Sequence, residues 1–142
     1  MTKAPHRAAT PQDVDEICLS LPEVELGTSW GDNLTYKVHG KGFLMHRPPG
    51  RTAVDPATGE WYADLLVIQV PSESEKRALV EDDSLPFFTI DHFNGYNAVL
   101  VQQSRLGEIS RDELAEIITD AWLTKAPKSL AKAIMTPGPV DG

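Results

Sequence analysis

Residues 91–102 read Asp-His-Phe-Asn-Gly-Tyr-Asn-Ala-Val-Leu-Val-Gln, a turn followed directly by an apolar run. Asn94 and Gly95 both tolerate a positive φ, which makes this pair a strong signal for a tight turn. Residues 98–102 have the composition of a strand buried in a core. A histidine, a phenylalanine and a tyrosine crowd the turn. The stretch therefore predicts a strand that begins beside a binding surface, without the side chains of a catalytic constellation.

The strands around this stretch are separated by breakers. Residues 34–39 alternate apolar and polar side chains, and two glycines within 39–42 turn the chain back into residues 43–46. The predicted strands are 34–39, 43–46, 62–70, 87–90 and 97–103. Residues 23–31 are interpreted as a connector. Residues 47–61 contain three prolines and two glycines, so we expect a long excursion outside the sheet.

Helices are predicted at both ends of the chain. Thr10 is a favoured N-cap before Pro11, and Pro22 ends the first helix. Its apolar side chains recur with helical spacing at Val14, Ile17, Cys18 and Leu21. Residues 110–113 form a capping-box pattern that begins a long helix with one apolar stripe. That stripe comprises Leu114, Ile117, Ile118, Ala121, Trp122 and Lys125.

Two shorter helices complete the pattern: one begins at the capping-box residues 72–75, and one follows a proline over residues 128–135. Consecutive strands joined by tight turns imply an antiparallel sheet, and helices from the two ends of the chain can pack on one of its faces. We predict an α+β fold, in which an antiparallel sheet of about five strands packs against N- and C-terminal helices. The predicted single domain spans 10–135, between flexible tails at 1–9 and 136–142.

Length and composition indicate the class of protein. The chain has 142 residues and a formal net charge of −8, which suits one globular domain with an acidic surface. No apolar run approaches the roughly 18 residues that cross a bilayer, and the first residues lack the apolar core of a signal peptide. The single cysteine, Cys18, lies in an apolar stripe and is interpreted as a small buried hydrophobe. We therefore expect a cytosolic protein without a disulfide, a cofactor or a membrane contact.

The charge is unevenly distributed along the chain. Residues 33–54 contain no acid and have a charge of +4, and residues 123–140 contain no acid and have a charge of +3. The cations of these two basic segments are Lys37, Lys41, Arg47, Arg51, Lys125, Lys128 and Lys132. Two basic segments on an acidic body predict a face that binds anions, and DNA phosphates are the first candidate. The alternative is an unevenly charged, solvated surface without a ligand.

The second candidate site is the aromatic turn itself. Polar-tipped aromatic and amide side chains in loops can line a pocket, so we predict a ligand cleft between the sheet and the helices at this turn. Its residues are Trp30, His92, Asn94 and Tyr96. A small molecule or a protein segment is then the alternative partner to DNA. Phe93 and Trp122 are instead interpreted as core residues.

Catalytic and metal sites are not predicted. Ser29, Asp91 and His92 supply the residue types of a nucleophilic triad, but the chain has no nucleophile elbow. The four histidines share no metal-ligand spacing. The acids in and after the first helix are interpreted as a solvated face rather than an iron site; they are Asp13, Asp15, Glu16, Glu23 and Glu25. The sequence therefore predicts a non-catalytic binding protein.

Several short motifs occur in order along the chain. They are Leu-Ser-Leu-Pro at 19–22, Gly-Thr-Ser-Trp-Gly at 27–31, Gly-Lys at 40–41 with Phe43, His-Phe-Asn-Gly-Tyr at 92–96, and Asp-Ala-Trp at 120–122 with Ala-Pro-Lys at 126–128. With these motifs the chain resembles the MmcQ/YjbR family from about residue 12 to residue 132.

The resemblance implies a CyaY-like fold, an antiparallel sheet backed by helices that is similar in outline to frataxin. It implies little about function, because the family has no established activity and its usual DNA-binding label rests on fold-level reasoning. The excursion at residues 47–61 is longer than the connection that members of the family usually have. The extra residues Arg51 and Trp61 change the surface beside the predicted hairpin.

Overall fold

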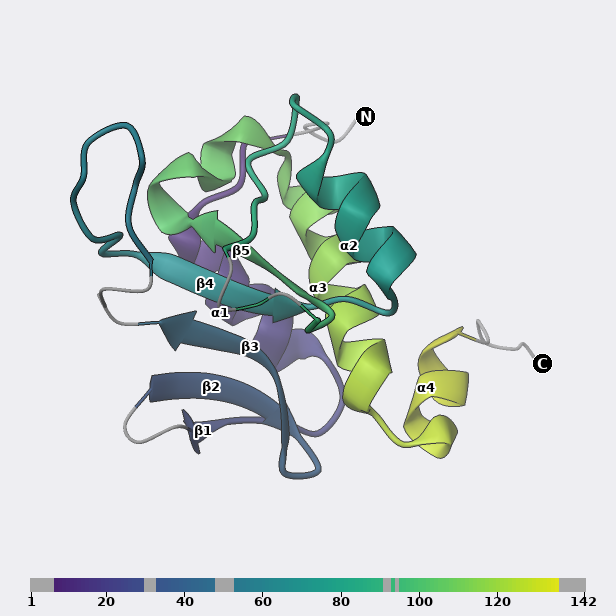
Figure 1. Cartoon of the computed structure of the whole chain (residues 1–142). Coiled ribbons are helices and arrows are strands. Elements are labelled where there is room, and N and C mark those ends of the chain that lie inside the picture. Colours follow the sequence, from purple (N-terminus) through teal and green to yellow (C-terminus); the bar gives the residue numbers. More distant parts are fainter. Residues whose placement is uncertain (1–6, 30–32, 48–52, 91–92, 94, 136–142) are drawn as a thin grey trace.

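The computed structural model describes residues 7–29, 33–47, 53–90, 93 and 95–135. Its elements are α1 (Pro11–Ser20), β1 (Val24–Ser29), β2 (Asn33–Val38), β3 (Lys41–Arg47), β4 (Leu65–Gln69), α2 (Glu73–Val80), β5 (Ala98–Gln102), the 3₁₀ helix η2 (Gln103–Glu108), α3 (Arg111–Lys125) and α4 (Lys128–Met135). The strands form one antiparallel sheet in the order β1-β2-β3-β4-β5, and α1 and α3 lie on one of its faces (Figure 1). The predicted α+β class is confirmed.

Local sequence signals account for the helix ends. The Thr10 hydroxyl accepts a hydrogen bond from the Asp13 backbone N–H while the Asp13 carboxylate accepts one from the Thr10 N–H, so α1 begins in a capping box. Ser110 and Glu113 form the same reciprocal pair at the start of α3. Such caps satisfy backbone donors that have no partner inside the helix. Both helices therefore begin where the sequence predicts.

The helices α1 and α3 bury the larger apolar core against the sheet. Trp122 of α3 is fully buried, and its indole N–H donates to the Pro22 carbonyl at 3.1 Å, which ties α3 to the end of α1. Cys18 is also fully buried, as the apolar stripe predicts. Large, fully buried members of this core include Leu44, Leu66, Ile68, Leu106, Leu114 and Ile118.

A two-residue turn joins β2 to β3. Val38 pairs with Lys41, and His39 and Gly40 between them have φ values of 50° and 80°. Positive φ at both central residues is the geometry that matches the twist of the two flanking strands. The predicted hairpin is confirmed, with a tighter turn than the predicted residues 39–42.

Two strand predictions were wrong. Residues 24–29, expected in a connector, form the edge strand β1, which pairs along its length with β2. Residues 87–90, expected as a strand, make one isolated bridge between Phe88 and Leu100. The physical reason is the same in both cases, because a strand is decided by a partner that its own pattern does not reveal. The strand count of five was correct although one member differed from prediction.

Two boundaries also differ from the sequence-based expectation. Strand β4 starts at Leu65 rather than Tyr62. Arg7 to Ala9 belong to the folded body, because the Ala9 N–H donates to the Ile109 carbonyl at 2.9 Å and the Arg111 N–H donates to the Arg7 carbonyl at 2.8 Å. The described part of the excursion, residues 53–61, lies outside the sheet as expected and closes on itself through a bridge between Val54 and Trp61. The predicted tails at 1–6 and 136–142 lie outside the described residues.

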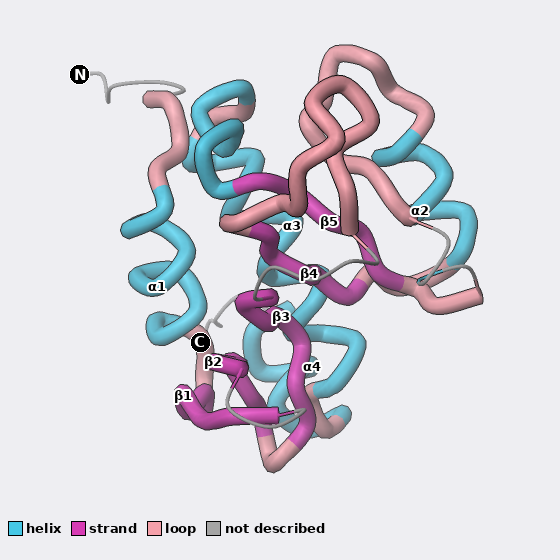
Figure 2. Tube along the Cα trace, turned by 60° about the vertical axis from the view of Figure 1, so that its left-hand side comes forward, coloured by secondary structure: helices cyan, strands magenta, loops and turns pink. Residues whose placement is uncertain are grey.

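The sheet face opposite α1 and α3 is called the open face below. Alternation along the strands places Met45, Val67 and Ala98 on it, and they belong to a second, smaller apolar cluster with Phe93. Loops rather than these two helices cover part of this face (Figure 2). Among the described residues, no helix is both long enough and apolar enough to cross a bilayer.

Candidate functional site

The directions of the strands bring several predicted site residues to one end of the sheet. Because neighbouring strands run in opposite directions, one end of the sheet contains the end of β2, the start of β3, the end of β4 and the start of β5. Lys37 and Lys41 flank the β2–β3 turn at this end of the sheet, and Gln69 is the last residue of β4 at the same end. Tyr96 lies just before β5, also at this end of the sheet. Residues from the two predicted sites are therefore neighbours on the fold.

A hollow of about 240 Å³ lies on the open face at this end of the sheet. Its apolar floor includes Met45, Val67 and Ala98, and its polar rim includes Lys37 and Gln69. The aromatic residues Phe93 and Tyr96 line it as well, together with Thr35, Gly40, Gly42, Phe43 and Leu44. This combination of an apolar floor with a few polar groups is typical of a ligand site.

Two glycines allow close packing at and beside this hollow: Gly42 in its lining and Gly27 under the Lys37 side chain. A Cβ atom at Gly42 would lie 2.7 Å from the γ-methyl group of Thr35, too close for any side chain. A Cβ atom at Gly27 would lie 3.7 Å from the Lys37 Cδ atom, so the Lys37 side chain extends over the position that Gly27 leaves bare. Glu25 faces Lys37 in the register of β1 and β2, yet no carboxylate of the described residues lies within ion-pair distance of the Lys37 ammonium.

A buried lysine contacts the backbone of the aromatic turn at Phe93 and Tyr96. The Lys76 ammonium of α2 donates to the Phe93 carbonyl at 2.8 Å and to the Tyr96 carbonyl at 2.7 Å. The turn itself is closed by the Tyr96 N–H, which donates to the Phe93 carbonyl at 3.0 Å, and Gly95 has a φ of 88°. Lys76 is 9% exposed, and desolvation lowers the pKa of its ammonium. Lys76 therefore holds the backbone carbonyls of Phe93 and Tyr96, while the Tyr96 side chain is 61% exposed.

Lys76 was not predicted from the sequence, although a signal for it exists. Lys76 lies three and four residues before Leu79 and Val80, which are partly buried against the larger core. Residues at these spacings share one face of a helix. A lysine on the apolar face of a short helix therefore predicts a buried hydrogen-bond partner, but it does not say that the partner is a turn seventeen residues away.

Arg47 lies apart from the lysines of the same basic segment. It ends β3, so its Cα atom lies about 20 Å from that of Lys41 at the other end of the strand. Its guanidinium lies 5.5 Å from the centre of the Phe93 ring on the open face. Burial lowers the pKa of Arg47. Arg47 therefore packs over the smaller apolar cluster rather than extending into solvent beside Lys41.

Lysines and arginines differ in their partners. Four described arginines form ion pairs with carboxylates: Arg7, Arg77, Arg105 and Arg111. Five lysines of the predicted basic segments form no ion pair within the described part of the chain: Lys37, Lys41, Lys125, Lys128 and Lys132. We call these five residues the lysine set. No carboxylate that the structure describes lies within ion-pair distance of their ammonium groups.

The lysine set gathers toward one end of the molecule. Lys125 ends α3, and Lys128 and Lys132 belong to α4. Figure 1 and Figure 2 both place α4 and the β2–β3 turn at the lower end of the view. Arg51, the remaining predicted cation, lies outside the described residues.

The comparison with protein families agrees with the motifs in the sequence. The model of the family described as YjbR matches residues 19–124, which is most of the chain. The chain belongs to the YjbR family. The resemblance to the MmcQ/YjbR family is thereby confirmed.

Curated relatives of this YjbR protein carry names without a function. Uncharacterized protein Mb2600 of Mycobacterium bovis is 42% identical to the chain over 85 residues, and so are Uncharacterized proteins MT2646 and Rv2570 of Mycobacterium tuberculosis. In each case the match covers 60% of this chain and 60% of the length of the relative. No solved structure matches the chain.

Of the four residues predicted to form the ligand cleft of the YjbR protein, the structure describes only Tyr96. Trp30, His92 and Asn94 lie outside the described residues. Tyr96 borders the hollow on the open face and a second hollow of about 410 Å³ between the turn and α2. The second hollow is lined by Lys76, Arg77, Val80 and other α2 residues. Tyr96 is thus the residue that separates two concave surfaces.

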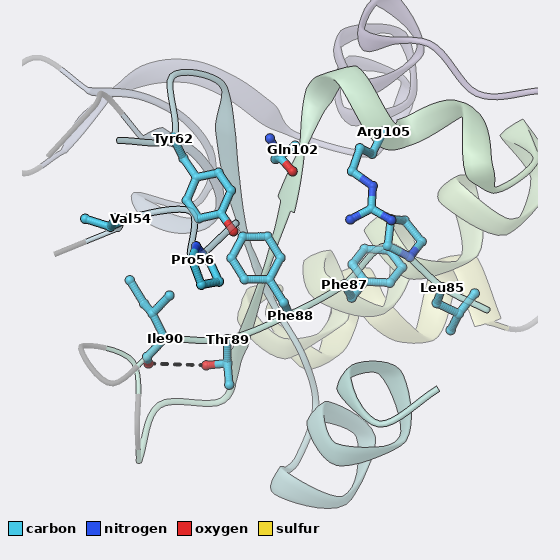
Figure 3. A pocket seen from close by; sticks show the side chains of 11 residues that line it. Val54, Pro56, Tyr62, Leu85, Phe87, Phe88, Thr89, Ile90, Gln102 and Arg105 are labelled. Atoms are coloured by element: carbon cyan, nitrogen blue, oxygen red, sulfur yellow. Dashed lines mark hydrogen bonds between the residues drawn. The ribbon is translucent and has the colours of Figure 1, made fainter. Parts of the chain in front are cut away.

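A larger groove on this YjbR protein was not predicted. It has a volume of about 700 Å³ and lies between the excursion and residues 85–90 (Figure 3). The rings of Tyr62 and Phe88 pack at 5.1 Å within it. Arg105 at its rim donates two hydrogen bonds to Glu108, at 2.7 and 3.0 Å, so its charge is offset. The groove has both apolar and polar lining residues and, unlike the end with the lysine set, does not concentrate positive charge among the residues described.

Other titratable groups of the YjbR protein serve its structure. Asp13, expected on a solvated face, is buried and accepts hydrogen bonds from Arg7 at 2.8 and 3.1 Å and from Arg111 at 3.3 Å. The Arg7 guanidinium lowers the pKa of Asp13 to about 2. Burial raises the pKa of Cys18, which makes its thiol unreactive. Within the described ranges, no group of three or more His, Cys, Asp or Glu residues could hold a metal ion.

Proposed function

We propose that this YjbR protein is a non-catalytic, cytosolic binding protein that contacts nucleic acid through the lysine set, without reading base sequence. The observation that carries the proposal is that, within the described ranges, five lysines at one end of the molecule lack carboxylate partners, whereas four arginines elsewhere have them. Lysine ammonium groups free of ion pairs can neutralise phosphates and release their counterions. Contacts of this kind position a protein on nucleic acid and carry no sequence information.

The net charge of −8 opposes the proposal only in part. At physiological ionic strength the Debye length is about 8 Å, so acids far from the lysine set are largely screened. Glu25 faces Lys37 and weakens the attraction there, so phosphates experience mainly cations at the other members of the lysine set. We therefore expect modest affinity, a steep dependence on salt, and binding by one end of the molecule.

The test is fluorescence anisotropy of labelled duplex DNA at several salt concentrations. The variant Lys41→Gln with Lys128→Gln removes two phosphate contacts, which should lower the slope of log affinity against log salt by about 1.8. The matched control is Arg77→Gln with Arg105→Gln, which removes the same charge from residues that are already ion-paired. The control should bind like the parent protein.

Two outcomes contradict the proposal. DNA binding that is undetectable at low salt would end it. Equal losses in the lysine and arginine variants would show that only total charge matters and that the lysine set has no special role.

A second candidate function is binding of a small ligand at Tyr96. It is favoured by the two hollows that meet at this exposed side chain. Nucleoside monophosphates and aromatic carboxylates are suitable probes, because each combines a planar ring for Tyr96 with an anion for Lys37. If the parent protein binds one of these probes, the double variant Trp30→Ala, Tyr96→Ala should no longer bind it. Unchanged affinity would remove this candidate.

A further inference from the structure

We propose that the nucleic acid bound by this protein is single-stranded, and that one unpaired base enters the hollow beside Tyr96. The inference rests on the proposed contact with nucleic acid and adds the class of strand. It joins the two candidate sites into one surface, because the hollow and the lysine set share Lys37.

The position of Lys37 carries the first step. Its ammonium has no carboxylate partner among the described residues, and its side chain lines the hollow. Lys41 lies just beyond the adjacent two-residue turn. Lys37 pairs with Gly42 and Lys41 pairs with Val38, so the two lysines leave opposite faces of the sheet. A phosphate backbone that contacts Lys37 therefore passes the rim of the hollow, with its bases close to the opening.

The chemistry of the hollow suits a base. Its floor is apolar at Met45, Val67 and Ala98, and the Gln69 side chain at the rim can both donate and accept hydrogen bonds. Tyr96 supplies an aromatic ring at the edge. Bases stack on aromatic side chains whatever their sequence, because every base has a π-face.

The Tyr96 ring is available for such stacking. Phe93 is its described aromatic neighbour, with ring centres 6.0 Å apart and an interplanar angle of 69°. An edge-to-face contact of this kind covers at most one face of the Tyr96 ring. The side chain is 61% exposed, and its backbone carbonyl is fixed by Lys76 at 2.7 Å. The ring therefore extends into solvent from a backbone position that a buried lysine holds.

The size of the hollow decides between single and double strands. Its volume of about 240 Å³ lies below the roughly 300–1,000 Å³ that is typical of sites for drug-sized ligands, so it suits one planar fragment. In a duplex the bases are stacked and paired, and placing one in a pocket requires that it be flipped out. A single strand presents unpaired bases without this step.

The experiment compares three labelled probes of equal length: oligothymidylate, the same strand with abasic sites, and a duplex. The parent protein should bind oligothymidylate most tightly. Tyr96→Ala should weaken binding of oligothymidylate by about tenfold and leave the abasic strand and the duplex unchanged. Tyr96→Phe retains the ring and should bind like the parent. Lys41→Gln with Lys128→Gln should weaken binding of all three probes.

The outcomes separate the inference from the proposal beneath it. If the lysine variant weakens every probe but Tyr96→Ala weakens none, nucleic-acid contact stands and the base-binding hollow is wrong. A duplex that binds as tightly as oligothymidylate would overturn the base-binding hollow in the same way. If no probe binds at low salt, both proposals fall together. Thermal unfolding of Tyr96→Ala provides the check that the variant is folded.

Discussion

The two faces of the sheet differ in how completely they are covered. On the helix-covered face, α1 and α3 bury a large core in which Trp122, Leu114 and Ile118 have no exposed surface. On the open face, loops cover a smaller apolar cluster and leave a hollow of about 240 Å³ beside an exposed tyrosine and Lys37. The contrast predicts that stability depends mainly on the helix-covered face.

The largest test of this contrast is Trp122→Ala. The change removes a fully buried indole and its hydrogen bond to the Pro22 carbonyl. Truncating a buried Trp or Phe to Ala typically costs about 3–5 kcal/mol, and we expect an unfolding free energy lower by this amount in chemical denaturation. Trp122→Phe, which retains a ring, should lose less. A loss below about 1 kcal/mol would show that the helix-covered face does not dominate stability.

The next test uses the buried carboxylate that joins α1 to the start of α3. Asp13 has a pKa of about 2, lowered chiefly by Arg7, against about 3.9 in the unfolded chain. A lowered folded-state pKa contributes stability that is complete above the unfolded value and is lost as the pH falls through the folded value. We expect about 2 kcal/mol from Asp13 at neutral pH, most of it lost between about pH 4 and pH 2.

The measurement is the unfolding free energy of the parent protein and of Asp13→Asn across this pH range. The difference between the two proteins should shrink as the pH falls. Glu16→Gln is the matched control, because Glu16 lies on the same helix and is exposed. A difference between the parent and Asp13→Asn that stays constant with pH would contradict the assignment.

The sequence predicted what is decided locally. Capping boxes at Thr10 and Ser110 and the helical spacing of apolar residues located α1 and α3. Strand β1 was missed because its alternation covers only Val24 to Leu26 before Gly27 interrupts it, and because its pairing with β2 decides its structure. The folded role of Arg7 was missed for a related reason, since its partner Asp13 resembles an ordinary first-turn acid.

The candidate site was predictable in its residue types and not in its geometry. The basic segments and Tyr96 could be identified along the chain, but ion pairing depends on contacts such as that of Arg111 with Asp13, which lie 98 residues apart. Which cations remain unpaired is therefore a property of the fold. The same holds for Lys76, whose two carbonyl partners are set by the packing of α2 beside the turn.

A smaller effect is expected from Lys76→Met, which removes the support of the turn on the open face. The loss of two hydrogen bonds from a buried ammonium is offset by relief of its desolvation, and we expect an unfolding free energy lower by about 1 kcal/mol. Lys128→Met removes an exposed lysine and should change stability by less than about 0.5 kcal/mol. A loss from Lys76→Met as large as that from Trp122→Ala would mean that the open face is as important for stability as the covered one.

The smallest effect is expected where binding is proposed. Tyr96 is 61% exposed, and its described ring contact is one edge-to-face arrangement with Phe93. Truncation of an exposed side chain usually changes stability by less than about 0.5 kcal/mol, and we expect this of Tyr96→Ala in chemical denaturation. A marked loss of stability would show that Tyr96 closes the smaller apolar cluster. Unchanged stability together with weakened binding would place its role in recognition, because a residue that holds the fold together cannot be removed without a change in the free energy of unfolding.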